Sequence, residues 1–131
     1  MCEIKRYCMS MEDHYGENVF EVCYPNIMGN PFTEVPKSKC KFKNLIKVKD
    51  KDEAIKLYEV YFNSMLKINS EFKNEFDRIY SAYLKFDVIY LGCFCKETEV
   101  CHSDVIIKKI KQRSVKEILK NLNIKTSIAN S

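Results

Sequence analysis

One short apolar run, at residues 86–91, constrains the fold of this 131-residue chain more than any other feature. Its sequence, FDVIYL, leads into Gly92 and is typical of a strand buried in a sheet. The segments on either side instead repeat apolar residues every three to four positions, which is the spacing of an amphipathic helix. A buried strand enclosed between helices predicts an α/β domain.

The helical segments have recognisable ends. Asp50 or Asp52 can cap the first helix, and a second helix is expected from about Ser70. Beyond the buried strand the apolar spacing of a helix returns. There, Ser114 and Glu117 form a capping-box pattern, which predicts that a separate last helix begins at that point.

Two further strands are expected near the N-terminus, at residues 4–9 and 19–24, and a loop with two of the three prolines follows at 25–32. We therefore predict an α/β fold with a central mixed sheet and flanking helices. A single small domain would cover residues 1–124, and residues 125–131 would form a frayed C-terminal tail. Ligands of such sheets bind beyond the carboxyl ends of the strands.

Composition narrows the classes of function. The formal net charge of +4 permits a small anionic ligand or a nucleic acid, without requiring the latter. No window approaches the 18 or more apolar residues of a membrane span, and the first residues lack the apolar run of a secretory signal. We therefore expect a cytoplasmic protein without a membrane partner. Its seven cysteines are odd in number and unevenly spaced, which does not favour a disulfide framework.

Three of these cysteines and a histidine lie within ten residues, directly after the buried strand. Cys93, Cys95, Cys101 and His102 form a Cys₃His set, a donor combination that zinc accepts in tetrahedral geometry. Three thiolates can instead hold an iron–sulfur cluster in which one ligand position is left vacant. The spacing C-x-C-x₅-C-H differs from paired C-x-x-C knuckles, so zinc and iron–sulfur both stay open as cofactors.

The same segment also suits thiol chemistry. Cys101 precedes a predicted helix, where the helix dipole stabilises a thiolate, and His102 or Asp104 can accept its proton. That helix N-terminus can equally bind a phosphate or carboxylate without any reaction. A purely structural interpretation is also open, in which Cys93 and Cys95 pack in the core and His102 caps the helix.

A run of alternating lysines, Lys37, Lys39, Lys41 and Lys43, places four ammonium groups on one face of an extended chain. The run fits a phosphate-binding stripe. It also fits a solvated edge strand, where lysines discourage unwanted pairing.

The chain resembles the uncharacterised family called domain of unknown function 4326, which occurs in bacteria and phages. The resemblance rests on the sequence G-N-P-F at 29–32, tyrosines 58 and 61, L-G-C-F-C at 91–95 and C-H-S-D at 101–104. It implies that these positions are signature positions: Gly29, Asn30, Pro31, Cys93, Cys95, Cys101, His102 and Asp104. Phe94 replaces the usual Trp, Ser103 replaces a Gly, and a Gly-Arg pair is missing before the early loop. The family brings no established activity.

Two hypotheses follow from these features. The first is a phage-type or bacterial domain that binds a nucleotide-like or other anionic ligand between residues 93–104 and a loop formed by Gly29, Asn30, Pro31 and Phe32. In this hypothesis Cys101 is a reactive thiol, and His102 and Asp104 are its partners. The second is a non-enzymatic interaction module, in which the cluster holds a structural zinc or an iron–sulfur centre and the lysine stripe contacts a nucleic acid or an acidic protein.

Overall fold

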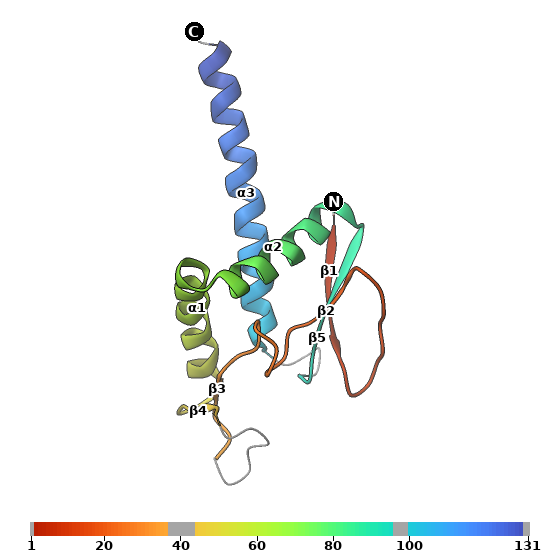
Figure 1. Ribbon diagram of the computed structural model, residues 1–131, viewed down its shortest axis with the longest axis vertical. Coiled ribbons are helices and arrows are strands. Elements are labelled where there is room, and N and C mark those ends of the chain that lie inside the picture. The colour runs from red at the N-terminus through yellow and green to blue at the C-terminus, as the bar shows by residue number, and fades with distance from the viewer. Residues whose placement is uncertain (1, 37–43, 96–99, 130–131) are drawn as a thin grey trace.

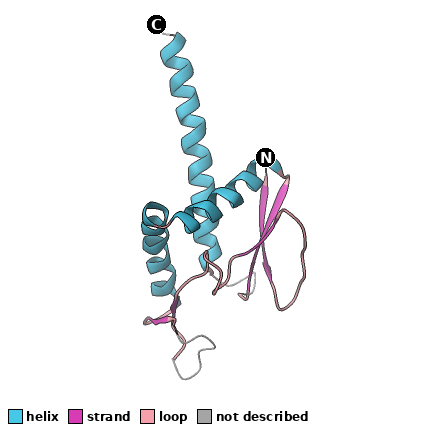
Figure 2. Ribbon diagram, in the orientation of Figure 1, coloured by secondary structure: helices cyan, strands magenta, loops and turns pink. Residues whose placement is uncertain are grey.

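A computed structural model describes residues 2–36, 44–95 and 100–129 of the chain. Along the chain the elements are β1 (Glu3–Cys8), β2 (Val19–Glu21), β3 (Phe32–Thr33), β4 (Ile46–Lys47), α1 (Lys51–Ile68), α2 (Ser70–Lys85), β5 (Val88–Cys93) and α3 (His102–Ala129). Figure 1 shows the main sheet beside the three helices, and Figure 2 shows how few residues are in strands. The predicted α/β class, one small domain with a sheet and flanking helices, is confirmed.

Strand β5, predicted from the run at 86–91, occupies the centre of the main sheet. The strand order is β1-β5-β2, and both pairings with β5 are parallel. β1 and β2 therefore do not pair with each other, since β5 lies between them. The chain passes from β2 to β5 through α1 and α2. Because all three strands run the same way, their carboxyl ends meet at one edge of the sheet.

The first two helices begin where side-chain caps allow. Asp50 accepts a hydrogen bond from the backbone N–H of Glu53 at 2.8 Å, so Asp50 rather than Asp52 caps α1. Asn69 ends α1 and also caps α2, since its side chain accepts from the N–H of Phe72 at 2.9 Å. A single asparagine therefore separates the two helices.

The predicted break at Ser114 is wrong, because α3 is one continuous helix from His102 to Ala129. The capping-box pattern fails because its acid has another partner. Glu117 accepts a hydrogen bond from the hydroxyl of Tyr80 on α2 at 2.8 Å. Residues 125–129, which we expected to be frayed, are within this helix, while the domain boundary at residue 124 stays a prediction.

The core lies between the helices and one face of the sheet. Ile89 and Leu91 of β5 are fully buried there, together with Tyr58 and Phe62 of α1 and Ile106 of α3. On the opposite face Gly92 lies under the ring of Tyr7, where a Cβ atom would come within 2.6 Å of that ring. Within the described ranges, no helix combines the length and apolarity needed to cross a bilayer.

Candidate functional site

The cysteine cluster lies at the carboxyl edge of the main sheet. β5 ends at Cys93 and α3 begins at His102, so the end of β5 and the start of α3 both lie at that edge. Cys8, the last residue of β1, is in register with Cys93, and the N–H of Val22 beyond β2 donates to the carbonyl of Gly92 at 2.9 Å. The three strand ends thus surround the position where ligands bind in parallel sheets.

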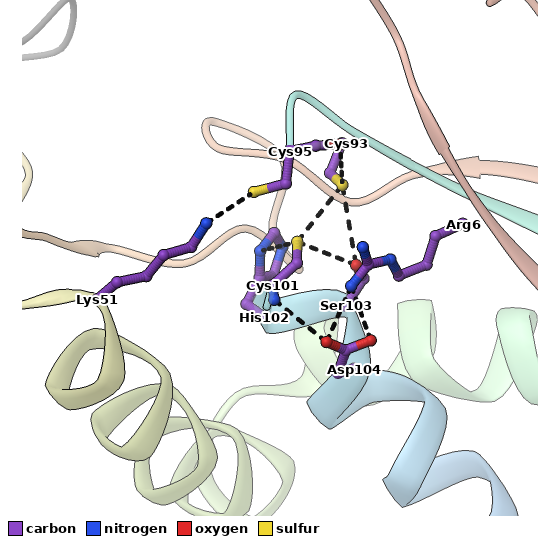
Figure 3. Close-up of polar contacts among 8 residues, drawn as sticks. All are labelled: Arg6, Lys51, Cys93, Cys95, Cys101, His102, Ser103 and Asp104. Carbon is purple, nitrogen blue, oxygen red and sulfur yellow. Dashed lines mark hydrogen bonds and ion pairs between the residues drawn. The ribbon is translucent and has the colours of Figure 1, made fainter. Parts of the chain in front are cut away.

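The three cysteines of the segment converge on one point. The sulfur atoms of Cys93, Cys95 and Cys101 all lie within 4.8 Å of one another, and Figure 3 shows them between β5 and the start of α3. The Cys93 and Cys101 sulfurs are 3.4 Å apart, and the hydroxyl of Ser103 donates to Cys101 Sγ at 3.1 Å. Cys93 and Cys101 are each 1 % exposed, whereas Cys95 is partly exposed and forms the open side of the cluster.

His102 borders this cluster, and a backbone carbonyl holds one of its two ring nitrogens. Its Nε2 atom lies 2.6 Å from the carbonyl oxygen of Val22, and because a carbonyl only accepts, Nε2 carries the proton. The other nitrogen, Nδ1, faces Cys101 Sγ at 3.6 Å. Among the described residues, the group of metal-ligand atoms that lie close together contains the three cysteines and not His102.

Charged side chains approach the cluster from three elements. Arg6 on β1 donates to both carboxylate oxygens of Asp104 at 2.8 and 2.9 Å, and this guanidinium is largely buried. Asp104 also accepts from the N–H of Cys101 at 3.2 Å, which fixes the start of α3. Lys51, the first residue of α1, points its ammonium group at Cys95 Sγ from 3.9 Å (Figure 3).

The close approach of the thiols separates their pKa values. Hydrogen bonds with Cys93 and Cys95 stabilise a thiolate at Cys101 and hold its pKa well below the ordinary value. The pKa values of Cys95 and Cys93 are raised, chiefly because each is hydrogen-bonded to that thiolate. Together the three groups can carry several negative charges only next to a compensating cation.

The Gly29–Phe32 loop approaches the cluster indirectly, through Tyr58. The hydroxyl of Tyr58 donates to the carbonyl of Met28 at 2.6 Å, and its ring meets the His102 ring edge-on at a centroid distance of 5.0 Å. The two signature segments therefore lie on opposite sides of one buried tyrosine. Their shared binding of a ligand stays a prediction.

Within the loop, the signature residues make structural contacts. A Cβ at Gly29 would lie 2.4 Å from the backbone nitrogen of Tyr24, so only glycine fits there. Asn30 accepts from the N–H of Phe32 at 3.0 Å and donates to the carbonyl of Ala54 at 3.2 Å. The carbonyl of Pro31 accepts from Ile46 N at 2.7 Å, and Phe32 packs edge-on against Tyr61.

Sequence reasoning missed two charged residues at this site, Arg6 and Lys51, and did not place Tyr58 beside the cluster. Arg6 could have been suspected, since it alternates with Ile4 and Cys8 and therefore faces the helices with them. Lys51 and Tyr58 come from α1, and only the packing of that helix brings them to the cluster. The predicted lysine stripe, Lys37 to Lys43, falls outside the described residues.

Comparison with known proteins gives one match. No curated protein and no solved structure is similar enough to this chain to count as a match. The model of one family covers residues 4–112, which include β1 from its second residue, the other described strands, α1, α2, the cysteine cluster and the first part of α3. The chain therefore belongs to the family described as domain of unknown function DUF4326.

Proposed function

We propose that this protein binds one divalent, thiophilic metal ion, zinc, through Cys93, Cys95 and Cys101. The observation that carries the proposal is the convergence of three sulfur atoms within 4.8 Å. Zinc–thiolate bonds of about 2.3 Å in tetrahedral geometry place the sulfurs roughly 3.8 Å apart, so small shifts of the three sulfur atoms suffice. An iron–sulfur cluster is less well supported, because its ligands are spread over several iron atoms.

The surrounding charges favour a divalent ion. Three thiolates and the carboxylate of Asp104 carry four negative charges, while Arg6 and Lys51 carry two positive ones. A divalent cation balances the two negative charges that are left. Soft thiolate donors also favour zinc over magnesium or calcium, which take oxygen ligands.

Only three ligand atoms lie close together in the described part of the chain, which supports a binding function rather than a closed structural site. Three protein ligands with one open position are typical of zinc sites that take up water or a ligand. Lys51 and the N-terminus of α3 both favour a negatively charged group beside this position. We therefore extend the proposal to a small anionic ligand, nucleotide-like or otherwise, that enters on the partly exposed side of Cys95.

Thiol chemistry at Cys101, with His102 and Asp104 as its partners, is the second candidate. The contact between Cys101 Sγ and His102 Nδ1 at 3.6 Å favours it. The burial of Cys101, which is 1 % exposed, weighs against attack on a substrate. For that reason we place metal binding first.

Metal analysis of protein purified without chelator tests the proposal. We expect about one zinc per chain, and little or no zinc in Cys95→Ser. Cys95 is partly exposed, whereas Cys93 and Cys101 are buried, so its substitution should affect folding less than that of either other cysteine. Cys2→Ser is the matched control, because Cys2 lies before β1, at the opposite edge of the sheet, and should keep full zinc content.

A cobalt titration of metal-free protein supplies an independent readout, since cobalt bound to thiolates gives strong charge-transfer absorption. Full zinc content in Cys95→Ser, or no metal and no cobalt spectrum in the folded wild-type protein, would exclude the site. If metal-free protein is instead alkylated rapidly and selectively at Cys101, thiol chemistry replaces metal binding as the function.

A further inference from the structure

Two of the three clustered sulfur atoms are in near contact. Cys93 Sγ and Cys101 Sγ lie 3.4 Å apart, although Cys93 ends β5 and Cys101 directly precedes α3. Both are free thiols in this structure. The S–S bond of a disulfide is about 2.05 Å long, so a small further approach brings the two atoms to bonding distance. The pair can therefore close to a disulfide when an oxidant removes two electrons.

Cys95 supplies the access that this buried pair lacks. Cys93 and Cys101 are each 1 % exposed, so a reagent from solution does not meet them first. Cys95 is partly exposed, and its sulfur lies within 4.8 Å of both others. Figure 3 shows the Cys95 sulfur turned toward Lys51, on the open side of the cluster. An oxidant therefore reaches the cluster at Cys95.

Two other cysteines near the same edge of the sheet have different partners. The sulfur of Cys8 lies 3.1 Å from the hydroxyl oxygen of Ser10. The sulfur of Cys23 lies 3.7 Å from that of Met9. Neither cysteine belongs to the group of close ligand atoms found among the described residues. The positions of the sulfurs thus favour oxidation within the cluster of three.

We propose that Cys95 is an oxidation site, through which a hydroperoxide converts Cys93 and Cys101 to a disulfide. The disulfide removes two of the three metal ligands, because the thiolate is the form of cysteine that binds a metal. The disulfide itself rests on the positions of the sulfurs. The release of zinc that follows from it rests on the proposed metal site.

The oxidation balances with hydrogen peroxide in three steps. Cys95 passes its proton to the Cys101 thiolate and attacks the peroxide, so that an S–O bond forms, the O–O bond breaks and hydroxide leaves. That hydroxide takes the proton back from Cys101, whose thiolate attacks the Cys95 sulfur, forming an S–S bond and releasing a second hydroxide. The second hydroxide deprotonates Cys93, which attacks the Cys101 sulfur and frees Cys95 as a thiolate. Two thiol groups and one peroxide thus give one disulfide and two waters.

Hydrogen peroxide added to the metal-free protein tests the disulfide. We expect two thiols to be lost per chain and a peptide linked through Cys93 and Cys101 in mass spectrometry. Cleavage after Lys96 separates Cys101 from the other two cysteines, and cleavage after Phe94 separates Cys93 from Cys95. The zinc-loaded protein should release one zinc per disulfide formed, and dithiothreitol should reverse both changes.

Cys95→Ser tests the route, because this variant keeps both partners of the disulfide. We expect the bond between Cys93 and Cys101 to form about tenfold more slowly, since the oxidant no longer meets an exposed thiol. Circular dichroism checks that the variant is folded. Cys2→Ser removes a partly exposed cysteine at the opposite edge of the sheet, so this matched control should oxidise at the wild-type rate.

The outcomes separate this inference from the proposed function. Folded protein that binds zinc but forms no disulfide between Cys93 and Cys101 would overturn the inference and leave the metal site standing. A disulfide that forms in protein without any affinity for zinc would do the reverse. Oxidation of Cys95→Ser at the wild-type rate would overturn the route through Cys95.

Discussion

Tyr58→Phe removes a single oxygen atom at the junction of the two signature segments. Tyr58 is completely buried, and its hydroxyl donates to the carbonyl of Met28, itself a buried residue, at 2.6 Å. Phenylalanine keeps the ring, and with it the edge-on contact with His102. The substitution therefore isolates one hydrogen bond between α1 and the segment that precedes Gly29.

The expected cost follows from the burial of the acceptor. A carbonyl that loses its partner in the interior is left without water, and such a loss costs about 1–2 kcal/mol in the free energy of unfolding. For a chain of 131 residues, an unfolding entropy of about 2.1 cal/mol/K per residue amounts to roughly 0.28 kcal/mol/K. A loss of about 1.5 kcal/mol therefore lowers Tm by about 5 °C.

Thermal unfolding followed by circular dichroism measures this change. Tyr61→Phe is the matched control, because Tyr61 lies one turn along the same helix and its hydroxyl makes no hydrogen bond within the described part of the chain. We expect Tyr61→Phe to change Tm by less than about 2 °C, because it keeps the partly buried ring and removes no hydrogen bond seen in the described part of the chain. Equal shifts in the two variants would refute the reasoning, since they would show that the Tyr58 hydroxyl contributes nothing specific.

Two further predictions concern the sheet and the contact between α1 and α3. Gly92→Ala should destabilise the fold by about 1–3 kcal/mol in urea unfolding, because the new Cβ would overlap the buried ring of Tyr7; the cost should fall in a Tyr7→Ala background. Glu59→Gln should cost about 0.5–1 kcal/mol at neutral pH, since Glu59 loses its charged partners Lys108 and Lys109. Hydrogen bonding to Lys108 lowers the pKa of Glu59, so its contribution is present above about pH 4.3 and is lost as pH falls below that value. An equal difference between the wild type and Glu59→Gln at pH 3 and pH 7 would contradict this assignment.

Much of the secondary structure could be predicted because local signals determine it. The periodicity of α1 and α2 and the caps at Asp50 and Asn69 are properties of neighbouring residues. Ser114 with Glu117 is an equally good local signal, yet it fails. The reason is a tertiary contact. The hydroxyl of Tyr80 donates to the Glu117 carboxylate, which a capping box would need as an acceptor for a backbone N–H.

The order of the strands could not be predicted in the same way. No local pattern indicates that β5 lies between β1 and β2, although that order sets the composition of the site. It brings Arg6 beside Asp104, which is 98 positions away in the chain. The cysteines of residues 93–101 could be identified from their spacing, whereas their charged neighbours depend on register and helix packing.

The proposed zinc site depends on where its fourth ligand comes from. Nε2 of His102 donates to the carbonyl of Val22 at 2.6 Å, so Nδ1 keeps a lone pair and faces Cys101 Sγ at 3.6 Å. Histidine ligands of metals commonly have their second ring nitrogen bonded to a carbonyl in this way. Among the described residues, however, the group of close ligand atoms contains the three cysteines and not His102. In the proposed site, the fourth position therefore stays available to a small anionic ligand unless the His102 ring moves toward the other two sulfurs.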